Sequence, residues 1–370
     1  MRIRRLLSVA AVVLTGCAGS DTASDVGTTV TTDRPAETAA PASEPAETAA
    51  PVTEPADGDE PAPTDVAEAD DGILVIDGPA RVRPSCVSLT RGVTDLTLDA
   101  GGGVHDVRIF VPTEVSSDPA PVVLDWHGLR STGPEQAALS GYEALAEDEG
   151  FIVVHPTGLA ASAEGPTSWE FGDIDVPGRD DVAFADALID TLVTDWCGDP
   201  DRIYSTGMSN GGFFTAELVC RRADRIAAAV SVAGITHPEG CNPARAVPYL
   251  AFHGTDDRIV PYAGTGESSV FDEVDPDGSF GQVMPDEFAE FVADAGCDAE
   301  PVRTEETPEV ISHSFTGCAD DVPMTFYEIV GGGHTWPGST MGGQPSDYGF
   351  STDDISATVD GWAFMSQYSL

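Results

Sequence analysis

The sequence predicts an α/β protein with a mostly parallel, doubly wound sheet of about eight strands flanked by helices. Between residues 73 and 370, short Val- and Ile-rich runs alternate with longer segments of helical apolar periodicity. The runs at 122–127 and 151–155 are nearly continuous in apolar residues, as buried parallel strands are. We expect strands near 94–99, 104–111, 122–127, 151–155, 202–206, 227–233, 248–253 and 323–330, and helices near 134–148, 181–195, 210–222, 285–296 and 353–366.

A Gly-x-Ser-x-Gly motif, residues 207–211, lies between the expected strand 202–206 and the expected helix 210–222. A serine between such a strand and helix occupies a tight, strained turn, and the two glycines let the strand and the helix pass close together. The turn exposes the hydroxyl beside the free N–H groups of the helix N-terminus. We therefore predict Ser209 as a catalytic nucleophile. The alternative is a glycine-rich turn whose serine only caps the helix.

A serine nucleophile needs a base and an acid that orients the base. The strand 248–253 runs into a loop with two adjacent acids, Asp256 and Asp257, and the strand 323–330 runs into a glycine-rich loop with His334. Both loops follow the C-terminal ends of strands, where open α/β sheets place their sites. The chain order Ser, Asp, His selects His334 as the base. We interpret His127 and His253 as structural, and the remaining histidines, His105, His155, His237 and His313, as incidental.

Four motifs resemble those of the secreted polyhydroxybutyrate depolymerase and feruloyl esterase family of α/β-hydrolases. They are Trp-His-Gly at 126–128, DPDRIYSTGMSNGG at 199–212, HGTDDRIVPY at 253–262 and GGGHTWPG at 331–338. The resemblance extends from about residue 104 to the C-terminus. It implies an α/β-hydrolase fold and ester hydrolysis by a Ser-Asp-His triad. The family pattern H-G-x-x-D places the acid on Asp257, and Asp256 then caps the turn.

Two backbone N–H groups are expected to form an oxyanion hole for the charge that develops during acyl transfer. One belongs to Asn210, directly after the nucleophile, and the other to Leu129, in the loop after His127. Trp336 either lines the acyl pocket or pins its loop by packing. Trp169 lies in the connection 156–180, which we expect to form the rim of the substrate pocket. This connection lacks the cysteine-rich form that it often has in the family.

The N-terminal residues 1–17 predict a lipoprotein signal peptide. Arg2, Arg4 and Arg5 precede an apolar run, 6–14, that is too short to span a bilayer. The following Leu-Thr-Gly-Cys resembles a lipobox, with Cys17 as the acylated residue. The alternative is an ordinary cleaved signal peptide. Either interpretation places the protein outside the cytoplasm, secreted or anchored to the cell membrane by lipid.

We expect residues 18–72 to form a disordered tether and residues 73–370 to form the catalytic domain. The tether repeats a ten-residue pattern, 35–44 and 45–54, and is rich in Pro, Ala, Glu and Thr. It contains almost no large apolar side chains, so it cannot offset the entropy lost on ordering.

Six cysteines remain after Cys17, and an even number in an exported domain suggests three disulfides. We pair Cys297 with Cys318, which close a short loop between the 285–296 helix and the strand that precedes His334. Cys197 and Cys220 both belong at the bottom of the sheet and could pair. Cys241 competes for either of them, and Cys86 takes the remaining partner, so these pairings stay open.

The formal net charge of −46, with no lysine in the chain, argues against a nucleic-acid partner, because phosphate contacts need a basic face. Two alternative explanations of this composition stay open, adaptation to salt or a codon preference for arginine over lysine. The chain has no HExxH metal motif, no Walker A sequence and no dinucleotide fingerprint. We therefore expect no metal and no cofactor, and a monomer whose partners are an ester substrate and, through Cys17, a membrane.

These features together predict an extracellular serine esterase. Its expected substrates are short-chain esters, hydroxyalkanoate polyesters, or feruloyl and acetyl esters of polysaccharide. The glycine- and acid-rich connections 156–180 and 258–283 favour short or polar acyl groups over long fatty chains. The alternatives are an inactive cell-surface binding lipoprotein, which the intact Ser, Asp and His disfavour, and a serine peptidase, for which the chain lacks room for a propeller or large cap.

Overall fold

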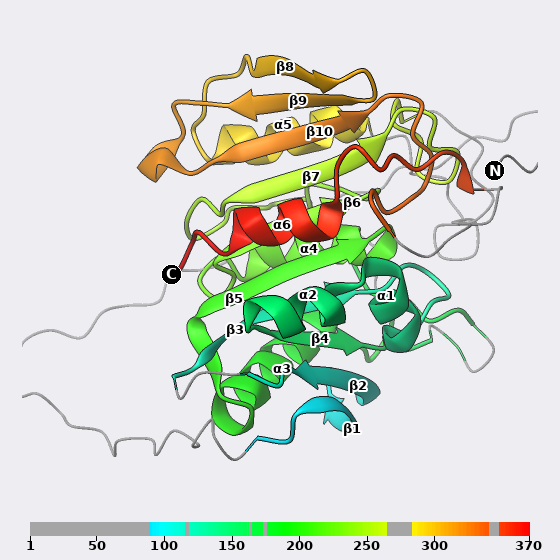
Figure 1. Ribbon diagram of the computed structural model, residues 1–370, viewed down its shortest axis with the longest axis vertical. Coiled ribbons are helices and arrows are strands. Elements are labelled where there is room, and N and C mark those ends of the chain that lie inside the picture. Colours follow the sequence, from blue (N-terminus) through cyan, green and yellow to red (C-terminus); the bar gives the residue numbers. More distant parts are fainter. Residues whose placement is uncertain are drawn as a thin grey trace, which may run out of the picture. The chain divides into compact units, whose positions relative to one another are not determined.

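The computed structural model describes residues 89–114, 118–160, 162, 165–172, 176–264, 283–339 and 348–370, all within one unit of the chain, Ile76–Leu370 (Figure 1). The predicted signal peptide with Cys17, the predicted tether and Cys86 lie outside the described residues. Among the described helices, none has both the length and the apolar character needed to cross a membrane.

Ten strands form one sheet in the order β1-β2-β4-β3-β5-β6-β7-β10-β9-β8. Their bounds are β1 Gly92–Ala100, β2 Gly103–Val111, β3 Ala120–Trp126, β4 Ile152–Pro156, β5 Gly198–Met208, β6 Ala228–Val232, β7 Tyr249–Gly254, β8 Val302–Thr307, β9 Val310–Phe315 and β10 Met324–Ile329. The six central strands from β4 to β10 are parallel. Antiparallel pairs extend the sheet at both edges. The predicted mostly parallel sheet is confirmed, and all eight expected strands are present.

Strands β8 and β9 form a hairpin that the sequence did not predict. Five of the six residues of β8, a Val-Arg-Thr-Glu-Glu-Thr segment, are exposed. A strand at the edge of a sheet with little cover on either face carries no apolar alternation, which is the signal that identifies strands in a sequence. Charged side chains on such an edge also oppose pairing with a second chain.

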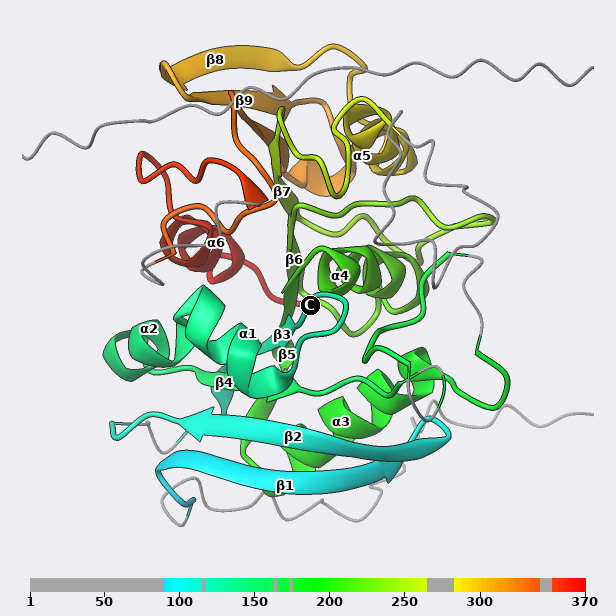
Figure 2. The same ribbon diagram turned by 90° about the vertical axis from the view of Figure 1, so that its right-hand side faces the viewer.

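Helices cover both faces of the sheet, as the doubly wound prediction requires (Figure 2). Their bounds are α1 Gly133–Ser140, α2 Tyr142–Glu149, α3 Asp181–Asp195, α4 Asn210–Arg221, α5 Met284–Asp294 and α6 Ala357–Met365, with a short 3-10 helix, η2, at Ala319–Asp321. Helices α1, α2 and α6 lie on one face, and α3, α4 and α5 on the other. Each face buries its own apolar cluster, one with Phe151 and Trp336, the other with Trp126 and Phe214.

The segment 134–148, predicted as one helix, is two helices. Gly141 has φ 70°, ends α1 and precedes the first residue of α2. This left-handed conformation is open to glycine without steric cost and breaks the helical hydrogen-bond pattern. The apolar periodicity of the sequence continues across Gly141 and so does not reveal the break.

Helix α3 begins at a true N-cap. The carboxylate of Asp180 accepts the N–H of Ala183 at 2.8 Å, the usual bond of a capping aspartate. Asp181 is the first helical residue, and its side chain is buried in an ion pair with Arg179.

Two disulfides are seen between described cysteines. Cys297 pairs with Cys318, which confirms the prediction. Cys220, at the end of α4, pairs with Cys241 in the connection between β6 and β7. The suggested pairing of Cys197 with Cys220 is therefore wrong, although Cys197 is itself disulfide-bonded.

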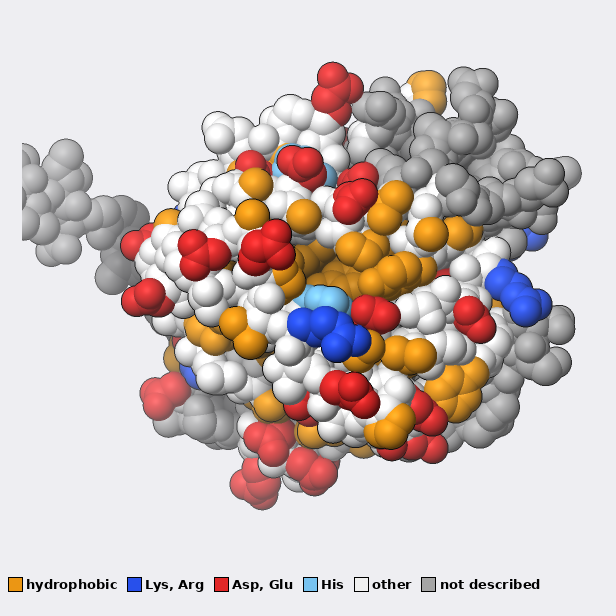
Figure 3. Space-filling model, turned by 90° about the horizontal axis from the view of Figure 1, so that it is seen from above, with side chains coloured by type: hydrophobic (Ala, Val, Ile, Leu, Met, Phe, Trp, Pro, Cys, Tyr) orange, Lys and Arg blue, Asp and Glu red, His pale blue; other side chains and the backbone are white. Residues whose placement is uncertain are grey.

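Acidic side chains dominate the charge of the chain, with 63 Asp and Glu against 17 Arg. On the face drawn in Figure 3, carboxylates are spread between apolar and uncharged groups, and basic side chains are few.

Candidate active site

Ser209 occupies a strained turn between β5 and α4. Its backbone has φ 56° and ψ −119°, which a residue with a side chain seldom adopts. A Cβ on Gly207 would lie 2.5 Å from the carbonyl oxygen of Gly211, and one on Gly211 would lie 2.0 Å from that of Trp126. Only glycine fits these two positions, and the strand–turn–helix context predicted from the motif is confirmed.

The loop that follows β3 lies beside the Ser209 side chain. A Cβ on Gly128 would be 3.5 Å from the Cβ of Ser209. Leu129 is the next residue of this loop, and Asn210 begins α4 on the other side of Ser209. The two residues predicted as oxyanion donors therefore belong to segments that both adjoin Ser209. The turn itself is anchored by a hydrogen bond from the Ser209 N–H to the carbonyl of Val232 at 2.8 Å.

Asp257 and His334 lie on loops after the neighbouring strands β7 and β10. Nδ1 of His334 is 2.8 Å from Oδ2 of Asp257. The other carboxylate oxygen accepts the N–H groups of Ile259 and Val260 at 2.8 and 2.9 Å, which fixes its orientation. Asp256 is exposed and contributes its own N–H to the carbonyl of Gly332. The structure thus brings Asp257, rather than Asp256, to His334.

Asp257 is buried but remains ionised. Burial alone would raise its pKa, but the charge of His334 and the hydrogen bonds from His253 and His334 outweigh burial and hold the pKa well below the usual value of about 3.9. Because a carboxylate only accepts hydrogen bonds, Nδ1 of His334 carries the hydrogen that joins the two residues. Nε2 is then the ring nitrogen able to take up a proton.

The His334 loop is held by a segment of chain near the C-terminus. The N–H of His334 donates to the carbonyl of Tyr348 at 2.7 Å, and that of Gly333 donates to Phe350 at 2.8 Å. The Tyr348 ring centroid is 6.3 Å from that of the His334 imidazole. Tyr348 is 39% exposed and Phe350 45%. Sequence reasoning missed both aromatic residues, because they belong to no motif or periodic segment.

Two other histidines near the site have structural roles, as predicted. Nε2 of His127 accepts the N–H of Gly158 at 2.9 Å, so Nδ1 must carry the hydrogen that it donates to the carbonyl of Gly128. Burial lowers the pKa of His127 to about 4, which keeps the ring neutral. His253 places Nε2 2.8 Å from the carbonyl of Val260 and 3.4 Å from Asp257.

Both tryptophans considered for the substrate pocket are buried. Trp336 is 0% exposed, and its Nε1 donates to Thr358 at 2.9 Å, which fits the loop-pinning role. Trp169 is 1% exposed and packs between Trp126 and Phe214 rather than at a rim. The large apolar area of an indole makes such burial favourable once a pocket in the core can accept its N–H.

Among the described residues, His237, Cys241 and Asp294 form one group of possible metal ligands. The sulfur of Cys241 is bonded to Cys220. A thiolate is the form that binds metal, so the disulfide leaves only two ligands, and His237 instead contacts Asp294 at 2.8 Å.

Comparison with known proteins finds several similar esterases, although no family model matches the chain. Feruloyl esterase B of Piromyces equi is 30% identical over 272 residues, which are 71% of this chain and 45% of the relative. The bifunctional acetylxylan esterase/xylanase XynS20E of Neocallimastix patriciarum is 29% identical over 170 residues, 46% of this chain and 24% of the relative. Feruloyl esterase D of Neurospora crassa is 24% identical over 299 residues, 76% of this chain and 88% of the relative. This chain thus spans less than half the length of the first two.

The parallel sheet covered on both faces, with Ser209 after β5 and acid and histidine loops after β7 and β10, defines an α/β-hydrolase. Within this class its sequence is similar to feruloyl esterases, in agreement with the resemblance seen in its motifs.

Proposed function

We propose that this protein is a serine carboxylic-ester hydrolase in which Ser209, Asp257 and His334 form the catalytic triad. The observation that carries the proposal is the 2.8 Å contact between His334 and Asp257, combined with the strained turn that presents Ser209 at the same edge of the sheet. Asp257 is buried and held by two backbone N–H groups, so it fixes the orientation of the His334 imidazole for the role of base.

The reaction follows from these positions. Nε2 of His334 takes the proton of the Ser209 hydroxyl as its oxygen attacks the ester carbonyl. The N–H groups of Leu129 and Asn210 stabilise the oxyanion that forms. His334 then returns the proton to the leaving alcohol, and an acyl group remains on Ser209. Water, activated by the same base, hydrolyses this acyl-enzyme and releases the acid.

Feruloyl and acetyl esters of plant polysaccharide are the substrates that we favour. The relatives are named feruloyl and acetylxylan esterases. The partly exposed ring of Tyr348 beside His334 offers an aromatic face to a feruloyl group. The three relatives described above are not named for hydroxyalkanoate polyesters, another substrate class suggested by the sequence.

An extracellular location suits this function, because polysaccharide is found outside the cell. The two disulfides fit an oxidising compartment. We propose that Cys17 carries the lipid that anchors the enzyme and that residues 18–72 act as its tether. The catalytic domain would then act as a monomer at the cell surface.

A panel of ester substrates tests the proposal on the purified protein. Nitrophenyl esters of increasing chain length, methyl ferulate and acetylated xylan should separate the classes, with acetyl, butyryl and feruloyl esters cleaved well and palmitoyl esters poorly. A long acyl chain gains about 0.8 kcal/mol per buried methylene only where an apolar tunnel receives it. A rate that keeps rising beyond about eight carbons would indicate a lipase and overturn the substrate assignment.

The same panel addresses the alternatives. Hydrolysis of none of these esters, with no reaction towards a fluorophosphonate, would favour an inactive binding protein. Cleavage of peptides in preference to esters would favour a serine peptidase on the same fold.

A further inference from the structure

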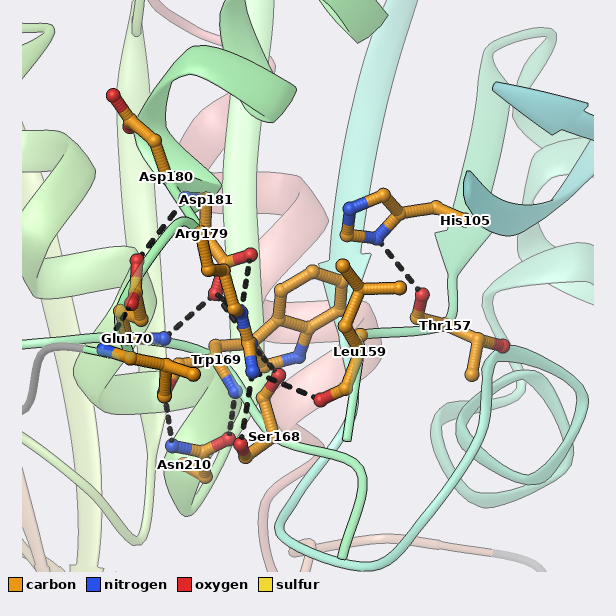
Figure 4. Close-up of polar contacts among 12 residues, drawn as sticks. His105, Thr157, Leu159, Ser168, Trp169, Glu170, Arg179, Asp180, Asp181 and Asn210 are labelled. Carbon is orange, nitrogen blue, oxygen red and sulfur yellow. Dashed lines mark hydrogen bonds and ion pairs between the residues drawn. The ribbon is translucent and has the colours of Figure 1, made fainter. Parts of the chain in front are cut away.

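One short segment of the chain, residues 167–169, contacts both segments that carry the proposed oxyanion donors. Its contact with Asn210 is drawn in Figure 4. The carboxamide of Asn210 and the backbone of Trp169 form a reciprocal pair of hydrogen bonds. Oδ1 of Asn210 accepts the Trp169 N–H at 2.6 Å, and Nδ2 donates to the Trp169 carbonyl at 2.9 Å. Asn210 is 2% exposed, so both bonds are shielded from water. The residue that would present one donor N–H is thereby held by its own side chain.

The same segment also holds the second loop. Nε1 of the Trp169 indole donates to the carbonyl of His127 at 3.1 Å. Two residues earlier, the carbonyl of Thr167 accepts the N–H of Arg130 at 2.9 Å, and its hydroxyl donates to the carbonyl of Ser131 at 2.7 Å. Leu129 lies between these anchor points, so the position of its N–H depends on the segment 167–169.

A buried ion pair supports this segment from behind. Nε of Arg179 donates to both carboxylate oxygens of Asp181 at 2.9 Å, and the two residues are 8% and 1% exposed. Arg179 also donates to the carbonyl of Ser168, and Asp181 accepts the N–H of Glu170 at 2.7 Å. The residues on either side of Trp169 are therefore fixed by one pair of charges (Figure 4). A charge-assisted network without access to water is costly to rearrange.

Packing leaves the Trp169 indole no room to rotate. Its ring stacks on Phe214 at a centroid distance of 5.4 Å and meets Trp126 edge-on at 5.0 Å. Core packing alone would account for a buried indole, but not for the amide pair to Asn210. That pair adds a fixed orientation for the first residue of α4, and an oxyanion hole requires donors that are oriented before the charge develops.

We propose that Asn210 and Trp169 are positioning residues that set the two oxyanion donors relative to Ser209, with the Arg179–Asp181 pair as their support. This inference rests on the proposed serine esterase function. In this proposal, one segment holds two donors that come from different parts of the chain. The connection 156–180 then supports the oxyanion hole and does not form the rim of the substrate pocket.

The variant Asn210→Ala tests the proposal, because it removes the carboxamide and keeps the backbone N–H that acts as donor. We expect kcat on a short ester to fall about 10- to 100-fold with KM nearly unchanged, less than the loss of about 10²–10³ when a donor is deleted outright. Trp169→Phe removes the bond to His127 and part of the indole packing but keeps the backbone pair with Asn210, so it should show a smaller loss. Substitution of Arg179 is unsuitable, since it would leave Asp181 buried without its partner.

The decisive measurement compares an ester with the matching thionoester, in which sulfur replaces the carbonyl oxygen. Sulfur is a weak hydrogen-bond acceptor, so a well-placed oxyanion hole gives a large rate ratio of ester over thionoester. Asn210→Ala should reduce this ratio. Ser205→Ala is the matched control, since Ser205 is fully buried in β5 and bonded to Trp126 and Thr215. It should lower stability and leave the ratio unchanged.

An unchanged ratio in Asn210→Ala, or an equal fall in Ser205→Ala, would overturn the positioning role. Should Asn210→Ala fail to fold, Asn210→Asp keeps the Oδ1 acceptor and is judged by the same ratio. Failure of the proposed function would look different. Ester hydrolysis that persists in Ser209→Ala, or that is absent from the wild type, would remove the triad itself.

Discussion

His334 and Asp257 are 77 residues apart in the chain, and their side chains meet at 2.8 Å through Nδ1 and Oδ2. Sheet order explains the meeting, because β7 and β10 are parallel neighbours and the loops after them leave the sheet at the same edge. Backbone N–H groups hold the second oxygen of Asp257. The carboxylate is therefore fixed in direction, with Oδ2 2.8 Å from Nδ1 of His334 and 3.4 Å from Nε2 of His253.

Replacement of Asp257 by Asn should lower kcat by about 10⁴, as expected when the histidine loses the carboxylate that selects its tautomer. The exposed Asp256 is the matched control, one residue away. Asp256→Asn should retain most of the activity, since Asp256 is exposed and the carboxylate that contacts His334 belongs to Asp257. Steady-state kinetics on a short nitrophenyl ester would measure both, and the opposite ranking would contradict the assignment.

Replacement of Ser209 by Ala should abolish nearly all ester hydrolysis. The anchoring bonds of the turn use the Ser209 backbone, so the fold should survive. A fluorophosphonate probe should label the wild type at Ser209 alone, as detected by peptide mass spectrometry. Labelling of the Ala variant would show that another residue is the nucleophile.

Stability should depend on pH through His127. Its pKa is about 4 in the folded protein, against about 6.5 in an unfolded chain. Above pH 6.5 both states are neutral, whereas between 6.5 and 4 only the unfolded chain binds the proton, so the free energy of unfolding falls as the pH falls. His127→Gln cannot bind this proton, and urea unfolding at pH 7 and pH 4.5 should show a smaller difference than in the wild type. Equal differences would mean that His127 is not buried as a neutral ring.

The lipid anchor is tested by Cys17→Ser. If Cys17 is acylated, the variant should leave the membrane fraction while the specific activity of the released enzyme stays the same. The physical reason is that the acyl chains alone would hold the protein to the bilayer. Mass spectrometry of the wild-type N-terminus provides the control, and an unmodified, soluble wild type would favour an ordinary cleaved signal peptide.

Much of the site was predictable because it depends on local signals. The glycines around Ser209, the strand before it and the helix after it are adjacent in the sequence, and each constrains the backbone by itself. The same holds for the glycine-rich loop before His334. Apolar runs identified the central strands, since parallel strands buried on both faces have few other compositions.

What the sequence did not reveal depends on contacts between distant residues. Asn210 and Trp169 are 41 positions apart, and no periodicity records that a carboxamide pairs with a backbone amide across that distance. Cys220 pairs with Cys241 and not with Cys197, because the connection after β6 brings Cys241 to the end of α4. The β8–β9 hairpin escaped prediction because its outer strand is mostly exposed.

Substitution of Gly211 tests whether close backbone packing requires glycine in the turn that carries Ser209. A Cβ at this position would lie 2.0 Å from the carbonyl oxygen of Trp126, and backbone cannot yield as a flexible side chain can. Gly211→Ala should therefore lose soluble, folded protein, or at least several degrees of thermal stability, together with activity. Gly128→Ala is the comparison, because its Cβ would make ordinary contacts of 3.5 Å with Met208 and Ser209. It should fold normally, and thermal unfolding followed by circular dichroism would measure both variants. Equal thermal stability of the Gly211→Ala and Gly128→Ala variants would mean that β3, β5 and α4 pack less closely around the turn than the structure shows.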